Sequence, residues 1–141
     1  SYCDLIMAHL RNRAAPPEVV RRVRFSIRLI RDSCFHHGPL STPELFKLVS
    51  FPGSPIPTRS YLKQYISRSQ ERTGIFTKEG LLKARPVNGS DEPALKDRVG
   101  TNFVWELTEK GKEEIENKPI ELEAEDEELI EKFVVQRPKF Q

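Results

Sequence analysis

Apolar residues recur along this chain at two different spacings, and the spacings distinguish helices from strands. In residues 18–35 they recur every three or four positions, which predicts a long helix with one apolar face. That face comprises Val20, Val23, Ile27, Ile30 and Cys34. In residues 103–107 they alternate with Val104 and Glu106, which predicts a strand. The chain therefore combines helices with extended segments.

Capping residues mark the starts of two further helices. Ser41 and Glu44 have the spacing of a capping box, so a helix is expected to run from there to residue 49. Thr58 is placed to cap a third helix over residues 59–72. A proline-rich connection separates these two helices.

The second half of the chain predicts a hairpin followed by a closing helix. Residues 81–87 alternate weakly as a strand, and residues 88–100 are polar and turn-forming. The strand 103–107 is expected to return beside it as the second strand of the hairpin. Thr108 is an N-cap for a helix that ends near residue 117.

These patterns divide the chain into three parts. Residues 1–17 form an N-terminal extension with a short helix, residues 18–117 form the folded domain, and residues 118–141 form an acidic C-terminal tail. The inward positions of the predicted elements should build the core of the domain. They are Val23, Ile27, Ile30, Leu45, Leu62, Ile66, Trp105 and Leu107.

The ordered set of elements resembles the winged-helix (winged helix-turn-helix) superfamily. The resemblance is carried by LSTPELFKLV (40–49), PTRSYLKQYI (57–66) and FVWELTEKGKEE (103–114). It implies a fold that is mainly α with a small antiparallel β-hairpin, here with extended N- and C-terminal tails. Two features depart from the family pattern, namely the long proline-rich connection 50–57 and the long loop 88–100. Both concern the docking of DNA more than the fold.

Charge is distributed unevenly along the 141 residues. Residues 1–72 hold 12 Lys and Arg against 5 Asp and Glu, a net charge of +7. Residues 73–112 hold 7 against 6, and residues 113–141 hold 4 against 10, a net charge of −6. A basic front half favours a polyanionic partner, although ordinary solvated faces would give the same totals.

The resemblance assigns the basic residues to a nucleic-acid interface. The helix 59–72 would be the recognition element, and the residues near its exposed face are Arg59, Ser60, Lys63, Gln64, Arg68 and Arg72. The hairpin region would add backbone contacts through Lys83, Arg85, Lys96 and Arg98. A second candidate is the arginine row beside the apolar face of the helix 18–35, which comprises Arg21, Arg24, Arg28 and Arg31. Such a row also occurs where arginines simply border a buried face.

Catalytic and metal-binding motifs are missing from the sequence. Cys34, His36 and His37 lack the paired spacing of a zinc site, and no phosphate-binding glycine loop or nucleophile motif occurs. We expect no enzyme activity, no cofactor, no metal and no small-molecule substrate. No run of apolar residues is long enough for a membrane span, and two cysteines suit a reducing compartment. The expected location is intracellular, either an organellar (mitochondrial) matrix or the cytoplasm or nucleus.

The function that these features favour is non-catalytic binding of nucleic acid, with RNA preferred to DNA. The leading hypothesis is a structural subunit of a large RNA–protein assembly such as an organellar ribosome. The alternatives are a DNA-binding transcription regulator and a purely protein-binding assembly adaptor. The acidic tail is expected to leave the nucleic acid and to dock on a neighbouring protein through Phe133, Val134 and Val135.

Overall fold

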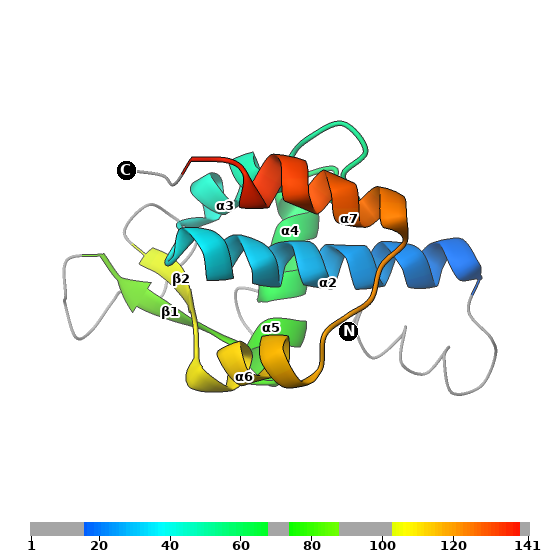
Figure 1. The fold of residues 1–141 in the computed structure, drawn as a ribbon. Coiled ribbons are helices and arrows are strands. Elements are labelled where there is room, and N and C mark those ends of the chain that lie inside the picture. The colour runs from blue at the N-terminus through cyan, green and yellow to red at the C-terminus, as the bar shows by residue number, and fades with distance from the viewer. Residues whose placement is uncertain (1–15, 68–73, 88–102, 139–141) are drawn as a thin grey trace.

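The computed structural model describes residues 16–67, 74–87 and 103–138, and within them the chain is mainly helical with one small antiparallel sheet (Figure 1). The first half contains α2 (Pro17–His37), α3 (Thr42–Val49), α4 (Arg59–Ile66) and the short α5 (Ile75–Lys78). The second half contains β1 (Leu82–Pro86), β2 (Phe103–Leu107), α6 (Glu109–Asn117), α7 (Ala124–Ile130) and the π-helical turn η2 (Glu131–Val135). The expected class, mainly α with a small hairpin, is therefore confirmed.

Helix α2 lies through the middle of the molecule and is covered from more than one side (Figure 1). It contacts α3, β2 and α6, and it also contacts α7 and η2, which run alongside it in the same direction. Its buried residues are Phe25, Ser26, Leu29, Ile30, Arg31, Ser33, Cys34 and His37. The buried surface is therefore wider than a single helical stripe.

This wide burial corrects the predicted apolar face of the helix. Val20, Val23 and Ile27 are only half-buried, whereas Phe25 and Leu29 belong to the core. Val23 and Ile27 have helical spacing in the sequence and were therefore expected to face the core. In the folded chain α7 and η2 pack against α2, and the neighbouring row that contains Phe25 and Leu29 is buried instead. The other six predicted core residues are buried as expected; they are Ile30, Leu45, Leu62, Ile66, Trp105 and Leu107.

The starts of α3 and α4 follow the capping residues. The Ser41 hydroxyl accepts a hydrogen bond from the amide of Glu44, whose carboxylate accepts one from the amide of Ser41 at 3.0 Å. The Thr58 hydroxyl accepts from the amide of Tyr61 at 3.1 Å. Helix α4 ends earlier than expected, at Ile66, because Ser67 has extended backbone. Its predicted continuation over residues 68–72 lies outside the described residues, as do the short helix 4–12 and the loop 88–100.

Strands β1 and β2 form a two-stranded antiparallel hairpin whose register runs from Leu82 opposite Leu107 to Pro86 opposite Phe103. Leu40 extends this sheet by one residue, since it exchanges two backbone hydrogen bonds with Trp105, at 2.7 and 3.1 Å. The alternating residues of β2 point into the core, as its two-residue period predicted. The hairpin is thereby fixed to the start of α3.

At the start of α6, Gly111 stands three residues after the N-cap Thr108, where a glutamate would complete a capping box. Thr108 caps α6 by accepting from the amide of Gly111 at 3.1 Å. A Cβ at position 111 would lie 2.4 Å from the carbonyl oxygen of Leu81. Glycine is required there because the backbone of residue 81 passes too close for any side chain.

The C-terminal segment, residues 118–138, folds back onto the domain of its own chain, where it had been expected to dock on a neighbouring protein. Ile130 and Val134 are buried with 2% and 0% of their surface exposed. The carbonyl oxygen of Val134 lies 2.7 Å from Nε2 of His37, and the rings of Phe133 and Phe51 stack 4.6 Å apart. Of the three side chains expected to meet a neighbouring protein, Val134 is therefore buried in the core of its own chain and Phe133 packs on Phe51, whereas Val135 is 36% exposed.

No helix among the described residues combines the length and the apolar character needed to cross a membrane.

Candidate nucleic-acid interface

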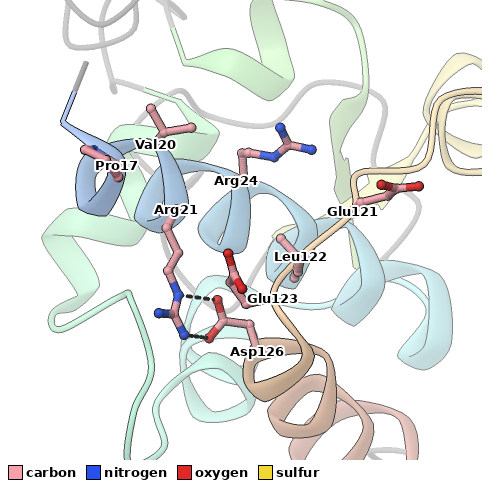
Figure 2. A pocket seen from close by; sticks show the side chains of 8 residues that line it. All are labelled: Pro17, Val20, Arg21, Arg24, Glu121, Leu122, Glu123 and Asp126. Atoms are coloured by element: carbon pink, nitrogen blue, oxygen red, sulfur yellow. Dashed lines mark hydrogen bonds and ion pairs between the residues drawn. The ribbon is translucent and has the colours of Figure 1, made fainter. Parts of the chain in front are cut away.

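Two of the four arginines in the row on α2, Arg21 and Arg28, form ion pairs with carboxylates from the C-terminal segment. Figure 2 shows Arg21 reaching from α2 to Asp126, with Nε to Oδ2 at 2.9 Å and Nη2 to Oδ1 at 3.0 Å. Glu125 lies 3.4 Å from the same guanidinium. The charge and hydrogen bonds of Asp126 raise the pKa of Arg21 above its ordinary value, so the guanidinium stays charged.

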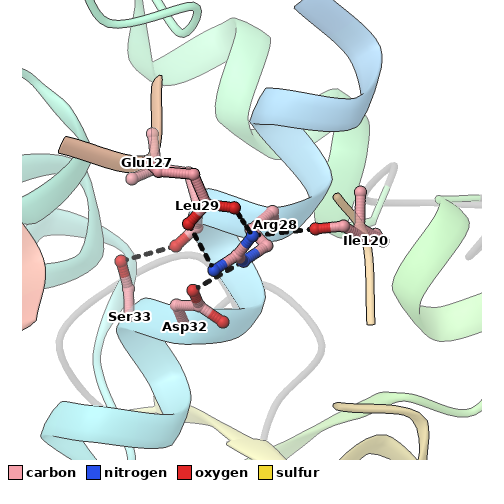
Figure 3. A network of polar contacts seen from close by, with 6 residues as sticks. All are labelled: Arg28, Leu29, Asp32, Ser33, Ile120 and Glu127. Carbon is pink, nitrogen blue, oxygen red and sulfur yellow. Dashed lines mark hydrogen bonds and ion pairs between the residues drawn. The ribbon is translucent and has the colours of Figure 1, made fainter. Parts of the chain in front are cut away.

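Arg28 holds three separate segments together (Figure 3). Its guanidinium donates to both carboxylate oxygens of Glu127, with Nη2 to Oε2 at 2.8 Å, and to the carbonyl oxygen of Ile120 at 2.8 Å. Nε donates to Asp32 one turn along α2 at 3.1 Å. Burial lowers the pKa of Arg28, but the bonds and charges of Glu127 and Asp32 outweigh it and the net shift is upward.

The remaining two arginines of the row lie in different surroundings. Arg31 is 6% exposed, and burial lowers its pKa although carboxylates of Asp32, Glu114 and Glu79 act in the opposite direction. Arg24 is exposed and lines a groove of about 450 Å³ between α2 and residues 121–126. In Figure 2 its side chain points away from Asp126. The row therefore does not present four free cations on one surface.

The start of α4 presents its polar side chains to solvent. Arg59, Ser60 and Gln64 are exposed, and Lys63 is half-buried. The Arg59 guanidinium lies 6.0 Å from the ring centre of Phe46 on α3. Within the described residues, neither Arg59 nor Lys63 forms an ion pair with a carboxylate. This face of α4 differs in that respect from the arginine row on α2.

The hairpin contributes less positive charge than expected. Lys83 on β1 is exposed, whereas Arg85 pairs across the strands with Glu106, with Nε to Oε2 at 2.9 Å. Such an exposed pair contributes little to stability, but it neutralises the arginine. Arg68, Arg72, Lys96 and Arg98 lie outside the described residues.

Trp105 is not part of a base-stacking surface. It is 7% exposed, and its indole Nε1 donates to the hydroxyl of Thr42 at 3.1 Å. The ring therefore packs in the core, as the alternation of the strand indicated. In the part of the chain that the structure describes, no three His, Cys, Asp or Glu side chains gather to hold a metal ion.

Sequence reasoning missed the partners of Arg21 and Arg28, since Asp126 and Glu127 were assigned to an acidic tail that docks on a neighbouring protein. A signal for them was present. Leu129 and Phe133, and Ile130 and Val134, are each four residues apart and form an apolar helical face directly after the acidic run. An acidic helix with such a face can dock beside a basic helix of the same chain.

Comparison with known proteins identifies no relative, because no protein-family model, no curated protein and no solved structure matches this chain.

Proposed function

We propose that this chain is a non-catalytic winged-helix module that contacts nucleic acid through α4 and the β1–β2 hairpin. The order of its elements supports the proposal. A helix, one bridged residue at Leu40, two helices, a hairpin and a closing helix follow one another as in that superfamily, with the short α5 added before the hairpin. In such a module the N-terminal residues of the third helix reach the nucleic acid.

The observation that carries this proposal is the exposed start of α4. Arg59, Ser60 and Gln64 are hydrogen-bonding side chains on the first two turns, where a recognition helix makes its contacts. Lys83 on the hairpin supplies a further cation for the phosphate backbone. Protein carboxylates already hold Arg21 and Arg28, so α4 is the better supported of the two candidate interfaces.

RNA is the favoured ligand because acidic α7 lies against the connection between α3 and α4. A Cβ on Gly53 in that connection would lie 3.3 Å from Leu129 of α7, and Glu128 beside it is exposed. A rigid DNA duplex with α4 in its major groove would bring phosphates past this connection and close to like charge, whereas the single-stranded loops and ends in which RNA is mostly recognised can turn away from it. The proposal therefore names RNA, within a large RNA–protein assembly of which an organellar ribosome is the leading example.

Two charge-matched double variants test the interface. Arg59→Gln with Lys63→Gln removes two cations from α4, and Arg22→Gln with Arg24→Gln removes two exposed cations from α2. Binding of a labelled single-stranded oligoribonucleotide is measured by fluorescence anisotropy over a series of salt concentrations. The α4 variant should bind more weakly, and its salt dependence should be shallower by about 0.7 in log–log slope for each lost phosphate contact.

Equal losses in the two variants would show a response to net charge alone and would contradict an interface on α4. The size of the native complex, with and without ribonuclease, tests the assembly. A complex that ribonuclease reduces supports the proposal. A complex of unchanged size would indicate the protein-binding adaptor, and migration as a free monomer would indicate the DNA-binding regulator.

A further inference from the structure

The carboxylates that hold Arg21 and Arg28 take the geometry that a phosphate group would take. Asp126 accepts two hydrogen bonds from Arg21, and Glu127 accepts two from Arg28. Paired donation of this kind is how arginine recognises both carboxylate and phosphate. Both side chains still reach solvent, since that of Arg21 is 45% exposed and that of Arg28 is 25% exposed. Without the carboxylates, a polyanion could therefore contact them.

We infer that Asp126 and Glu127 act as an internal phosphate mimic, which keeps nucleic acid off Arg21 and Arg28 of α2 and favours the face of α4. This inference rests on the proposed function, because it states which of two basic surfaces that function uses. The determinants are specific carboxylates on α7, each paired with an arginine about a hundred residues earlier in the chain.

The pairing of Asp126 and Glu127 with the two arginines is a fixed part of the fold. Ile130 and Val134, on the same segment, are in the hydrophobic core, and Arg28 also holds the backbone of Ile120. A ligand that displaced α7 would have to expose these side chains to water, which opposes the exchange of a carboxylate for a phosphate. Nucleic acid therefore meets α2 with Arg21 and Arg28 already neutralised, and with Arg31 buried.

Neutral substitutions can remove the mimic while leaving the apolar contacts in place. Asp126→Asn with Glu127→Gln keeps the shape and removes both charges. The matched control is Glu121→Gln with Glu123→Gln, which removes two charges from exposed side chains of the same segment. A third protein combines Asp126→Asn and Glu127→Gln with Arg21→Gln and Arg28→Gln.

Affinity for a short labelled oligouridylate is measured against salt concentration. The Asp126/Glu127 variant should bind more tightly than the control, with a log–log salt slope steeper by about 0.7 for each new phosphate contact, up to about 1.4 for two. Ultraviolet crosslinking should place the oligonucleotide on the peptide 17–37 of this variant. The fourfold variant should lose both the added affinity and the crosslink. A gain that depends on Arg21 and Arg28 places the added contacts on these two side chains.

Equal affinity and slope in the Asp126/Glu127 variant and its control would overturn the inference, since the carboxylates would then act through net charge alone. If that equality accompanies weaker binding in the Arg59/Lys63 variant, the proposed function stands and only the inference fails. If the Asp126/Glu127 variant gains binding on α2 while the Arg59/Lys63 variant binds as the wild type does, the mimic is supported and the α4 interface fails. Absence of binding by every variant overturns both.

Discussion

Replacement of Ile130 by alanine tests whether the C-terminal segment is part of the folded domain. Ile130 is 2% exposed and belongs to the same core cluster as Leu29 and Val134. The substitution removes three carbon atoms from this cluster. At about 0.8 kcal/mol for each buried CH₂, the lost transfer free energy is about 2.4 kcal/mol. The cavity that remains adds to this value, so the expected loss in free energy of unfolding is about 2–5 kcal/mol.

The matched control is Val135→Ala on the next turn of the same segment. Val135 is 36% exposed, and it loses two carbon atoms that are already partly hydrated. Its expected cost is about 1 kcal/mol or less. Both free energies are measured by urea denaturation. Unfolding is monitored by circular dichroism and by the fluorescence of Trp105, which lies in the same core cluster. The difference between the two variants isolates burial from any effect on local helix formation.

The reasoning fails if Ile130→Ala and Val135→Ala cost the same within about 0.5 kcal/mol, a difference too small for one buried and one exposed side chain. The segment would then not be docked in solution. The same logic applies to truncation after residue 117. The sequence alone led us to expect a domain that folds without the tail, whereas the structure predicts that truncation uncovers α2 and destabilises the domain.

Four further substitutions test the packing and the charges around α2 and α6. Leu29→Ala should cost about 2–5 kcal/mol in chemical denaturation and Ile27→Ala clearly less, because Leu29 is 0% exposed and Ile27 is only half-buried; the reverse order would restore the face predicted from sequence. Gly111→Ala should lower stability by about 1–3 kcal/mol despite the better helix propensity of alanine, because its Cβ would lie 2.4 Å from the Leu81 carbonyl oxygen; a rise in melting temperature would contradict this close approach. Burial raises the pKa of Asp32 above its ordinary 3.8, against the opposing effect of Arg28, so the folded state binds this proton more tightly than the unfolded state. The wild type should therefore lose stability as the pH rises from about 3.8 through the raised pKa, and Asp32→Asn should remove that part of the pH dependence; identical pH profiles from denaturation would refute the assignment.

Local interactions explain which elements were predictable from the sequence. Ser41, Thr58 and Thr108 each accept a hydrogen bond from an amide three residues ahead, so the start of each helix depends on residues that are adjacent in sequence. The alternation of Phe103, Trp105 and Leu107 likewise fixes which side of β2 faces the core. The predicted hairpin and the closing helix followed from the same short-range patterns.

The role of the arginine row could not be derived in this way. Charge totals showed that the front of the chain is basic and its end acidic. Because a charge attracts any opposite charge, these totals do not identify which residue pairs with which. Arg21 meets Asp126 across 105 positions of sequence, and Arg28 meets Glu127 across 99. Sequence reasoning therefore assigned both ends to outside partners.

The sequence by itself determined α2, α3, α4 and α6, the caps of the last three, the hairpin and most of the core, because each depends on contacts within a few residues or on a simple period. The tertiary structure decided which face of α2 is buried, that the acidic end completes the core, and which arginines remain exposed. Those outcomes depend on how α7 docks. That docking is set by the fit of Ile130 and Val134 against α2, together with the positions of Asp126 and Glu127, and it exists only once the chain has folded.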